Sequence, residues 1–151
     1  MEEVLTRIRS VADYQFGKGV GRVLFPDGVT VAFSRRTGRI RYVFLNGERL
    51  VTMRPTDGLF SLSVVGAKRV AGAAKCSVVV RDDVSKFIAE GGDVFAVHIL
   101  RADDEIRARD EVVVVEGGGK VLAVGRAVLS GEEMRAFKRG VAVKVRRGCR
   151  S

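Results

Sequence analysis

Three short apolar runs in the second half of the chain constrain its fold more than any other feature. They are Val112–Val115, Val121–Val128 and Val141–Val145, and all lie within the stretch 93–145. Each run is rich in β-branched residues and is bounded by glycine or by charged side chains, a pattern typical of β-strands. A GGGK turn joins the first two runs, so they predict a long hairpin. We therefore expect the second half of the chain to fold around a small β-sheet.

The residues around these runs complete an element order of β-α-β-β-β-α-β. The further elements that we predict are a strand at 77–80, a helix at 84–92 capped by Asp82 or Asp83 and ended by Gly91–Gly92, a strand or an extended buried passage at 94–100, and a short helix at 130–137. In the last helix Ser130 stands three residues before Glu133, which is the spacing of a capping box. Five short strands mixed with two short helices predict a small barrel-like domain.

The first half of the chain has the pattern of a helix followed by an antiparallel meander. The predicted elements are a helix at 2–12, strands at 29–33, 40–45 and 48–53, a strand or a strand entering a helix at 59–65, and a short helix with a link at 66–75. Asn46–Gly47 lies between two of these strands and is a strong signal for a two-residue hairpin turn. We therefore predict an α+β chain, with a small α/β-meander domain in front of the mixed β domain.

A glycine-rich stretch follows the first predicted helix. Gly17, Gly19 and Gly21 alternate with other residues, but their spacing is not the GxGxxG fingerprint and no strand clearly precedes them. The stretch also lacks the GK[ST] ending of a phosphate-binding P-loop. We interpret it as a flexible turn in preference to a phosphate-binding loop.

The charge of the chain points to an anionic partner. Lysine and arginine number 27 against 18 aspartate and glutamate residues, a formal net charge of +9. A surplus of this size favours nucleic acid or another polyanion, although a surface rich in ion pairs is an alternative. Aromatic residues make up only 7% and tryptophan is absent, so contacts to phosphate and shape are favoured over base stacking. No apolar run reaches the length of a membrane span and no signal peptide is evident, so we expect a cytoplasmic protein without a membrane partner.

A dense arginine cluster lies in the first half, between two predicted strands. Arg35, Arg36, Arg39 and Arg41 fall within seven residues. On an alternating strand Arg39 and Arg41 share one face, opposite Ile40. The cluster is either a solvated edge that discourages strand association or a surface that contacts phosphate, to which the guanidinium group is well matched. Residue types alone leave both interpretations open.

The cysteine and histidine content restricts the possible chemistry. Cys76, Cys149 and His98 are the only such residues, too few for a zinc site, and we expect neither a metal nor a cofactor. Cys76 opens an apolar run, which favours a buried and inert thiol. A disulfide between the two cysteines stays possible, since the sequence does not show whether they meet. His98 has either a structural role or a nucleotide contact.

Four phrases in the second half, in this order, resemble a PUA domain, the small RNA-binding pseudo-barrel of pseudouridine synthases and archaeosine transglycosylases. They are DVFA at 93–96, IRARDEVVVV at 106–115, LAVGRAVLSGEEM at 122–134 and KRGVAVKV at 138–145. The resemblance covers residues 74–149. The chain departs from the family at Val97–His98 and Ala108–Arg109, where the family often has Pro-Gly.

The first half resembles the domain that precedes PUA in the C-terminal region of archaeal tRNA-guanine (archaeosine) transglycosylases. The matching phrases are YQFGKGVG at 14–21, LFPDGVTV at 24–31, SRRTGRIR at 34–41, MRPTDGLFSL at 53–62 and GAKRV at 66–70. The resemblance implies a pre-PUA domain at 1–72 and a PUA domain at 73–151. The catalytic barrel of those enzymes needs about 250 residues and does not fit into this chain.

The resemblance implies a non-catalytic protein that binds RNA, with tRNA as the first candidate. In the family the first PUA helix, the loop before it and the last strand face the RNA, which nominates Arg81, Lys86, Gly91, Gly92, His98, Lys144, Arg146 and Arg147. The cluster of Arg35, Arg36, Arg39 and Arg41 is a second candidate surface on the ground of charge alone.

Two other functions stay as alternatives. A protein-interaction subunit could serve a separately encoded tRNA-modifying chain, or could act in ribosome assembly or translation. An RNA-modifying enzyme is disfavoured, because the only dense acid cluster, 103–105, falls in an exposed connection and one histidine cannot build a triad.

Overall fold

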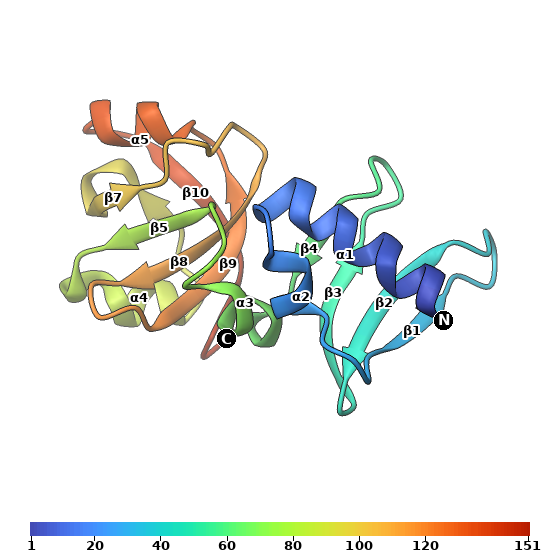
Figure 1. Cartoon of the computed structure of the whole chain (residues 1–151). Coiled ribbons are helices and arrows are strands. Elements are labelled where there is room, and N and C mark those ends of the chain that lie inside the picture. The colour runs from blue at the N-terminus through green and yellow to red at the C-terminus, as the bar shows by residue number, and fades with distance from the viewer. The chain divides into compact units, whose positions relative to one another are not determined.

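A computed structural model describes all 151 residues and divides into two compact units, Met1–Ala74 and Lys75–Ser151 (Figure 1). Each unit has its own buried apolar core and its own sheet. The first sheet has four strands and the second has six. None of the helices is both long and apolar enough to cross a lipid bilayer.

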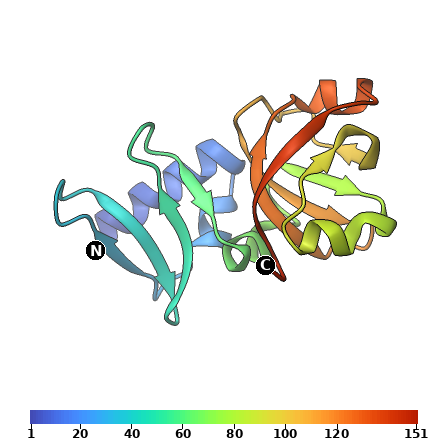
Figure 2. The ribbon, with the colours of Figure 1, turned by 180° about the vertical axis from the view of Figure 1, so that it is seen from behind.

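The first unit is a four-stranded antiparallel meander with helices on one face. Its elements are α1 (Glu2–Phe16), α2 (Val20–Leu24), β1 (Thr30–Phe33), β2 (Ile40–Leu45), β3 (Glu48–Met53), β4 (Phe60–Leu62) and α3 (Val64–Val70). The strands lie in chain order, so each pairs with the next, and Figures 1 and 2 show α1 across one face of them. Gln15 of α1 fixes this packing, because its amide bonds both backbone groups of Phe60 at 2.7 and 2.8 Å.

The predicted hairpin of the first unit is confirmed. Strands β2 and β3 have the predicted bounds, and Asn46 and Gly47 turn the chain with positive φ angles of 52° and 81°. The first helix continues beyond the predicted end to Phe16. The ambiguous stretch 59–65 is a strand that enters a helix, with Ser63 as the N-cap of α3.

The interpretation of the glycine-rich stretch as a flexible turn is wrong for its second half. Residues Val20–Leu24 form α2, and the turn is confined to residues 17–19, where Gly17 and Gly19 have φ angles of 123° and 87°. Gly21 lies against α1: its N–H donates to Asp13 Oδ1 at 2.6 Å, and a Cβ there would stand 2.2 Å from the carbonyl oxygen of Arg9. Glycine at this position therefore serves close helix packing, not flexibility.

The second unit is a six-stranded mixed sheet that curls into a pseudo-barrel (Figure 2). Its strands are β5 (Ser77–Val80), β6 (Val94–Phe95), β7 (Ile99–Ala102), β8 (Glu111–Glu116), β9 (Val121–Ala127) and β10 (Val141–Gly148), in the order β6-β10-β9-β8-β5-β7. Only β5 and β8 pair in parallel. Five consecutive residues of β8 are buried, as expected for a strand covered on both faces.

The helical elements of the second unit are short. They are η1 (Asp82–Val84), α4 (Ser85–Ala89), η2 (Ala96–His98) and α5 (Gly131–Ala136). The capping box of α5 is confirmed, with Ser130 accepting from the Glu133 N–H at 3.1 Å and Glu133 accepting from the Ser130 N–H at 2.9 Å. The predicted cap of the other helix by Asp82 or Asp83 is wrong, because its first turn is a 3₁₀ turn that Arg81 precedes without a side-chain cap.

Further outcomes concern the second unit. The hairpin of β8 and β9 is confirmed, and the last apolar run, Val141–Val145, lies in β10, which ends at Gly148. The passage at 94–100 is not one strand, because the 3₁₀ turn η2 interrupts it, and it is not a buried passage either, since Val97 and Leu100 are exposed. The possible disulfide does not form, since Cys76 and Cys149 are both free.

Arg109 adopts the left-handed backbone conformation, with φ at 79°. It stands at one of the two places where PUA sequences often have Pro-Gly. Its N–H donates to the Ala127 carbonyl at 2.7 Å, which ties the connection before β8 to the end of β9. The fold thus imposes on an arginine a conformation that glycine adopts without steric cost.

Candidate nucleic-acid interface

His98 and Arg81 are the first pair of predicted site residues that lie together. The Arg81 N–H donates to the His98 carbonyl at 3.0 Å, so the start of η1 runs beside the end of η2. The Arg81 guanidinium is paired with Asp83 at 3.1 Å. Two of the predicted contacts therefore share one surface, but a carboxylate already offsets the charge of Arg81.

The His98 ring is held by its own turn. Its Nδ1 accepts from the Phe95 N–H at 3.3 Å, and the two rings meet edge to face with centroids 5.5 Å apart. Burial lowers the pKa of His98 below its ordinary value of 6.5, the positive charge of Arg81 lowers it further, and Asp83 opposes both. The imidazole is therefore neutral near pH 7 and can offer a ring face and a nitrogen donor, but no charge.

Gly91 and Gly92 end the α4 segment, as predicted. Gly91 has a φ of 106°, in the region that favours glycine. The Gly92 N–H donates to the Phe87 carbonyl at 2.9 Å, and a Cβ at Gly92 would stand 2.3 Å from the Phe87 ring. The Phe87 side chain is half-exposed beside them. These glycines shape the backbone between α4 and β6, a structural role that is compatible with a binding surface.

The basic residues of β10 differ sharply in their surroundings. Lys144 is exposed and lies 3.5 Å from Asp93. Arg146 forms a two-pronged ion pair with Glu111, which is buried, and one of the two bonds is 3.0 Å from Nη1 to Oε1. Arg147 is exposed and has no carboxylate partner. The sequence marked Arg146 as an RNA contact, whereas the structure gives it a partner inside the second unit.

Lys86 is exposed on α4 and lines a small pocket of about 250 Å³. The other residues around this pocket are Asp82, Ser85, Ala89, Glu116, Lys120, Leu122, Cys149 and Arg150. Its charges are mixed, with three cations and two carboxylates. The two carboxylates offset most of the positive charge, so this pocket is a weak candidate for binding a phosphate.

The four arginines predicted in the first unit lie on and beside the turn between β1 and β2. Arg35, Arg36, Arg39 and Arg41 are all exposed, and Ile40 between the last two is buried, as the alternation predicts. None of the four forms an ion pair with a carboxylate. This is the largest group of uncompensated positive charge among the predicted site residues.

Tyr42 orients one of these arginines. Arg41 Nε donates to the Tyr42 hydroxyl at 2.9 Å, and its guanidinium carbon lies 5.1 Å from the Tyr42 ring centroid. Arg49 approaches the same ring at 6.0 Å. Cation–π contacts of this kind hold a flexible side chain in place without neutralising its charge.

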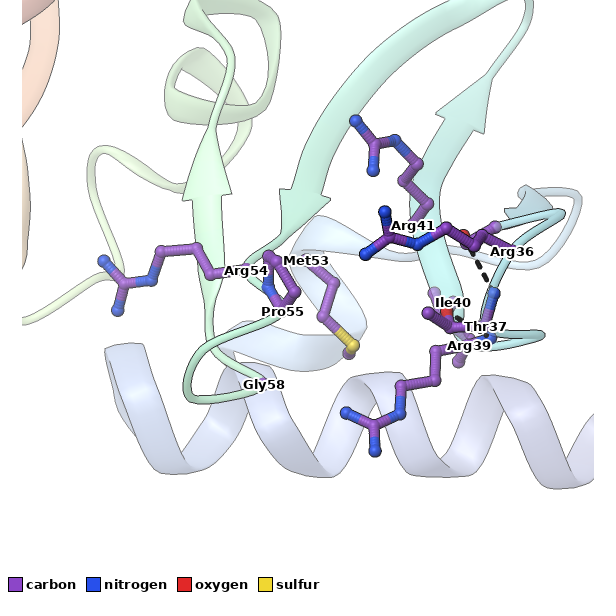
Figure 3. A pocket seen from close by; sticks show the side chains of 10 residues that line it. Arg36, Thr37, Arg39, Ile40, Arg41, Met53, Arg54, Pro55 and Gly58 are labelled. Carbon is purple, nitrogen blue, oxygen red and sulfur yellow. Dashed lines mark hydrogen bonds between the residues drawn. The ribbon is translucent and has the colours of Figure 1, made fainter.

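A pocket of about 380 Å³, which no sequence motif predicts directly, lies beside the arginine cluster. Its lining comes from two turns and the strand ends next to them: Ser34, Arg36, Thr37, Arg39, Ile40, Arg41, Met53, Arg54, Pro55 and Gly58. Figure 3 shows the Arg36 side chain extending toward Met53 and Pro55, and the Arg54 guanidinium pointing away from it. The usable signal in the sequence was the shared spacing of SRRTG at 34–38 and RPTDG at 54–58.

Two family models together match nearly the whole chain. Residues 6–75 match the family described as "patch-forming domain C2 of tRNA-guanine transglycosylase". Residues 77–149 match the PUA domain. The two matches follow the two compact units seen in the fold.

Curated relatives include the tRNA-guanine(15) transglycosylase of Methanothermobacter thermautotrophicus, which is 43% identical over 147 residues. The match covers 95% of this chain and 22% of that enzyme, in its C-terminal region. The enzyme of Thermococcus kodakarensis is 44% identical over 144 residues, covering 93% of this chain and 24% of the enzyme. The chain thus spans about a quarter of the length of these relatives.

A solved structure of similar size has the same fold. A hypothetical protein from Pyrococcus horikoshii OT3 superposes with a TM-score of 0.78 at 29% identity, covering 100% of this chain and 93% of that one. A conserved PUA domain protein from Thermoplasma acidophilum has a TM-score of 0.70 at 22% identity, with 97% and 89% covered, and supports the fold alone.

Proposed function

The chain joins domain C2 of tRNA-guanine transglycosylase to a PUA domain, and from this premise we propose that it is a non-catalytic protein that binds tRNA or another structured RNA. The observation that carries the proposal is the continuous match of 95% of the chain to the C-terminal region of tRNA-modifying enzymes. The 151 residues contain these two domains and no catalytic barrel. Binding without catalysis is the simplest function for such a combination.

Phosphate capture is the mechanism that the charges support. Positive side chains release counterions when they meet phosphates, and this gives affinity without base readout. In the first unit the contacts are Arg35, Arg36, Arg39 and Arg41. In the second unit they are Arg81, Lys86, Lys144 and Arg147. The neutral His98 adds a ring face and a nitrogen donor to this surface, and Gly91 and Gly92 shape the backbone between Lys86 and His98. Arg146 acts indirectly in this proposal, by holding β10 to the buried Glu111.

The finer proposal is an accessory role in tRNA modification. In this role the chain delivers or orients tRNA for a catalytic chain that is separately encoded. Co-purification from native extract tests this step, and recovery of a catalytic chain together with tRNA is the expected result. Recovery of ribosomal particles instead would favour the alternative role in ribosome assembly or translation.

The RNA-binding proposal is tested by titrating folded tRNA at several salt concentrations with fluorescence anisotropy. We expect log K to fall linearly with log salt, with a slope set by the number of phosphates neutralised. Replacing Lys86 and Arg147 by glutamine should reduce the slope by about two, since each side chain meets one phosphate. The control replaces Arg7 and Arg22, two exposed helix arginines of the first unit, and should leave the slope unchanged.

An absence of tRNA binding even at low salt would overturn the proposal. A salt slope that is the same in the Lys86/Arg147 variant and in wild type would remove the second unit from the interface. Turnover of tRNA by the isolated chain would replace the binding role by an enzymatic one.

A further inference from the structure

We infer that the pocket between the two turns of the first unit receives one unpaired nucleotide of the bound RNA, with its phosphate on Arg36, Arg39 and Arg41 and its base against Ile40, Met53 and Pro55. This inference rests on the proposed RNA-binding function and deepens it. It assigns a built site to the first unit, where the sequence offered only a cluster of positive charge.

The topology explains why this pocket exists. In an antiparallel meander, alternate hairpin connections lie at the same end of the sheet. The connection between β1 and β2 and the connection between β3 and β4 are therefore neighbours, and the hairpin of β2 and β3 lies at the opposite end. Residues about twenty positions apart in sequence thus form the two walls of one pocket (Figure 3).

The two turns have the same construction. In the first, the Ser34 N–H donates to the Arg39 carbonyl at 2.7 Å and the Gly38 N–H to the Ser34 carbonyl at 2.8 Å. In the second, the Arg54 N–H donates to the Leu59 carbonyl at 2.7 Å and the Gly58 N–H to the Arg54 carbonyl at 2.9 Å. The matching glycines have φ angles of 71° and 72°. Matched, hydrogen-bonded turns make the pocket walls well defined before any ligand arrives.

The turns differ in the charges that they carry, and this difference gives the pocket its polarity. In the second turn Asp57 pairs with Arg54 at 3.0 Å, which offsets that charge within the turn. In the first turn the side chain at the equivalent position is Thr37, which accepts from the Arg39 N–H at 3.3 Å and carries no charge. Arg36 and Arg39 therefore keep their positive charge, and the wall that they form suits a phosphate group.

The pocket also has apolar lining. Met53 and Pro55 provide it on the wall of the second turn, where Arg54 is paired with Asp57 and its guanidinium points away (Figure 3). The buried Ile40 provides it on the wall of the arginines. A volume of about 380 Å³ falls within the range of roughly 300–1,000 Å³ that is usual for small-molecule sites. A ligand that fits both walls has an anionic group for the arginines and a flat, weakly polar group for the apolar side chains. A nucleotide has both, in its phosphate and its base.

The pocket favours an unpaired nucleotide over a paired one. A base in a duplex is stacked and cannot leave its phosphate to reach an apolar wall, whereas unpaired bases in loops and at ends can be splayed out. Simple contact with a duplex backbone would need the arginines alone and would leave Met53 and Pro55 without a role. The free nucleotide is the other source of the same chemistry, and the experiment separates the two.

The test follows adenosine monophosphate by ¹H–¹⁵N NMR on the full chain, with adenosine and inorganic phosphate as partial probes. We expect the largest shifts at 34–41 and 53–58 with the monophosphate, and weaker binding of both partial probes. The variant Arg36→Gln should weaken monophosphate binding about tenfold, because one charge-assisted contact is lost. The control is Arg22→Gln, an exposed arginine of α2 outside the pocket lining, and should stay within twofold.

Competition with tRNA then identifies the source of the nucleotide. Displacement of the monophosphate from these residues by tRNA supports the inference. Simultaneous binding of tRNA and monophosphate overturns it, since the pocket would then serve a free nucleotide. Equal losses in the Arg36 and Arg22 variants, or binding of inorganic phosphate as tight as that of the monophosphate, overturn it as well. If tRNA binds but the monophosphate never shifts these residues, the inference fails and the RNA-binding function stands.

Discussion

Replacing Arg146 should unfold the second unit more easily, even though the sequence marks this residue as part of a binding surface. The Arg146 guanidinium holds the carboxylate of Glu111 with two contacts. The Glu111 side chain is 0% exposed, whereas that of Arg146 is 38% exposed. The variant Arg146→Gln therefore leaves a buried carboxylate without its guanidinium, while water can reach only the outer side of the pair.

The size of the effect follows from this asymmetry. Removing one partner of a fully buried ion pair costs roughly 3–5 kcal/mol, because the remaining charge stays desolvated. Since Arg146 is partly exposed, solvent screening lowers the figure, and we expect about 2–3 kcal/mol. For a domain of this size that loss corresponds to a fall in Tm of roughly 10–20 °C. The neighbouring exposed Arg147→Gln should change stability by less than about 0.5 kcal/mol.

The assay exploits the distribution of tyrosine. The chain has no tryptophan, and its two tyrosines, Tyr14 and Tyr42, both lie in the first unit. Tyrosine fluorescence therefore reports unfolding of the first unit, while far-UV circular dichroism reports both. We expect Arg146→Gln to move only a dichroism transition to lower urea concentration and to leave the tyrosine transition in place.

A double-mutant cycle with Glu111→Gln and Arg146→Gln measures the coupling between the two side chains. We expect the double variant to be more stable than the sum of the single losses predicts, by at least about 1 kcal/mol. Stability of Arg146→Gln equal to that of Arg147→Gln, or a coupling energy of zero, would refute the reasoning. Loss of tRNA binding by an Arg146 variant could then be assigned to direct contact.

Four further predictions concern packing, backbone conformation and ionisation. Gly21→Ala should destabilise the first unit by about 2 kcal/mol or more in urea denaturation followed by tyrosine fluorescence, because the methyl group would meet the backbone of α1; Gly72→Ala, with open space around it, is the control. Arg109→Gly should stabilise the second unit by about 1 kcal/mol in thermal denaturation by relieving its positive φ. In an NMR titration His98 should show a pKa below 6.5. The unfolded chain, in which the pKa of His98 is about 6.5, then binds a proton at a higher pH than the folded chain does, so the free energy of unfolding of the second unit should decrease as the pH falls below about 6.5. Burial raises the pKa of Cys76 to about 12, so mass spectrometry should find it unalkylated in the native protein at pH 8 and alkylated after denaturation.

Each of these predictions has an outcome that contradicts it. Equal stability of the Gly21 and Gly72 variants would mean that the two helices separate at little cost. A destabilised Arg109→Gly variant would mean that contacts of the arginine side chain stabilise the second unit by more than its backbone strain destabilises it. A His98 pKa above 6.5 would mean that the carboxylate of Asp83 outweighs burial and the charge of Arg81. Rapid alkylation of Cys76 in the native protein would mean that the structure around β5 opens readily.

Local patterns predicted much of the architecture correctly. The valine runs, the Asn46–Gly47 turn and the Ser130 capping box all act over a few residues, and their outcome depends little on distant parts of the chain. The alternation of Arg39, Ile40 and Arg41 likewise predicted which side chains face water. For the same reason the order of the strands in the first sheet follows the chain, since each hairpin pairs neighbours.

Features that depend on contacts between residues distant in the chain could not be predicted from local sequence patterns. Gly21 reads as a turn residue until α1 lies against it, and Arg146 reads as a surface charge until β8 brings Glu111 beneath it. A sequence records which residues neighbour one another along the chain, and these patterns suffice for strands, turns and caps. Desolvation of a carboxylate, close approach of two helices and the meeting of two turns at one end of a sheet arise only when the backbone folds back on itself, so tertiary structure alone decided them.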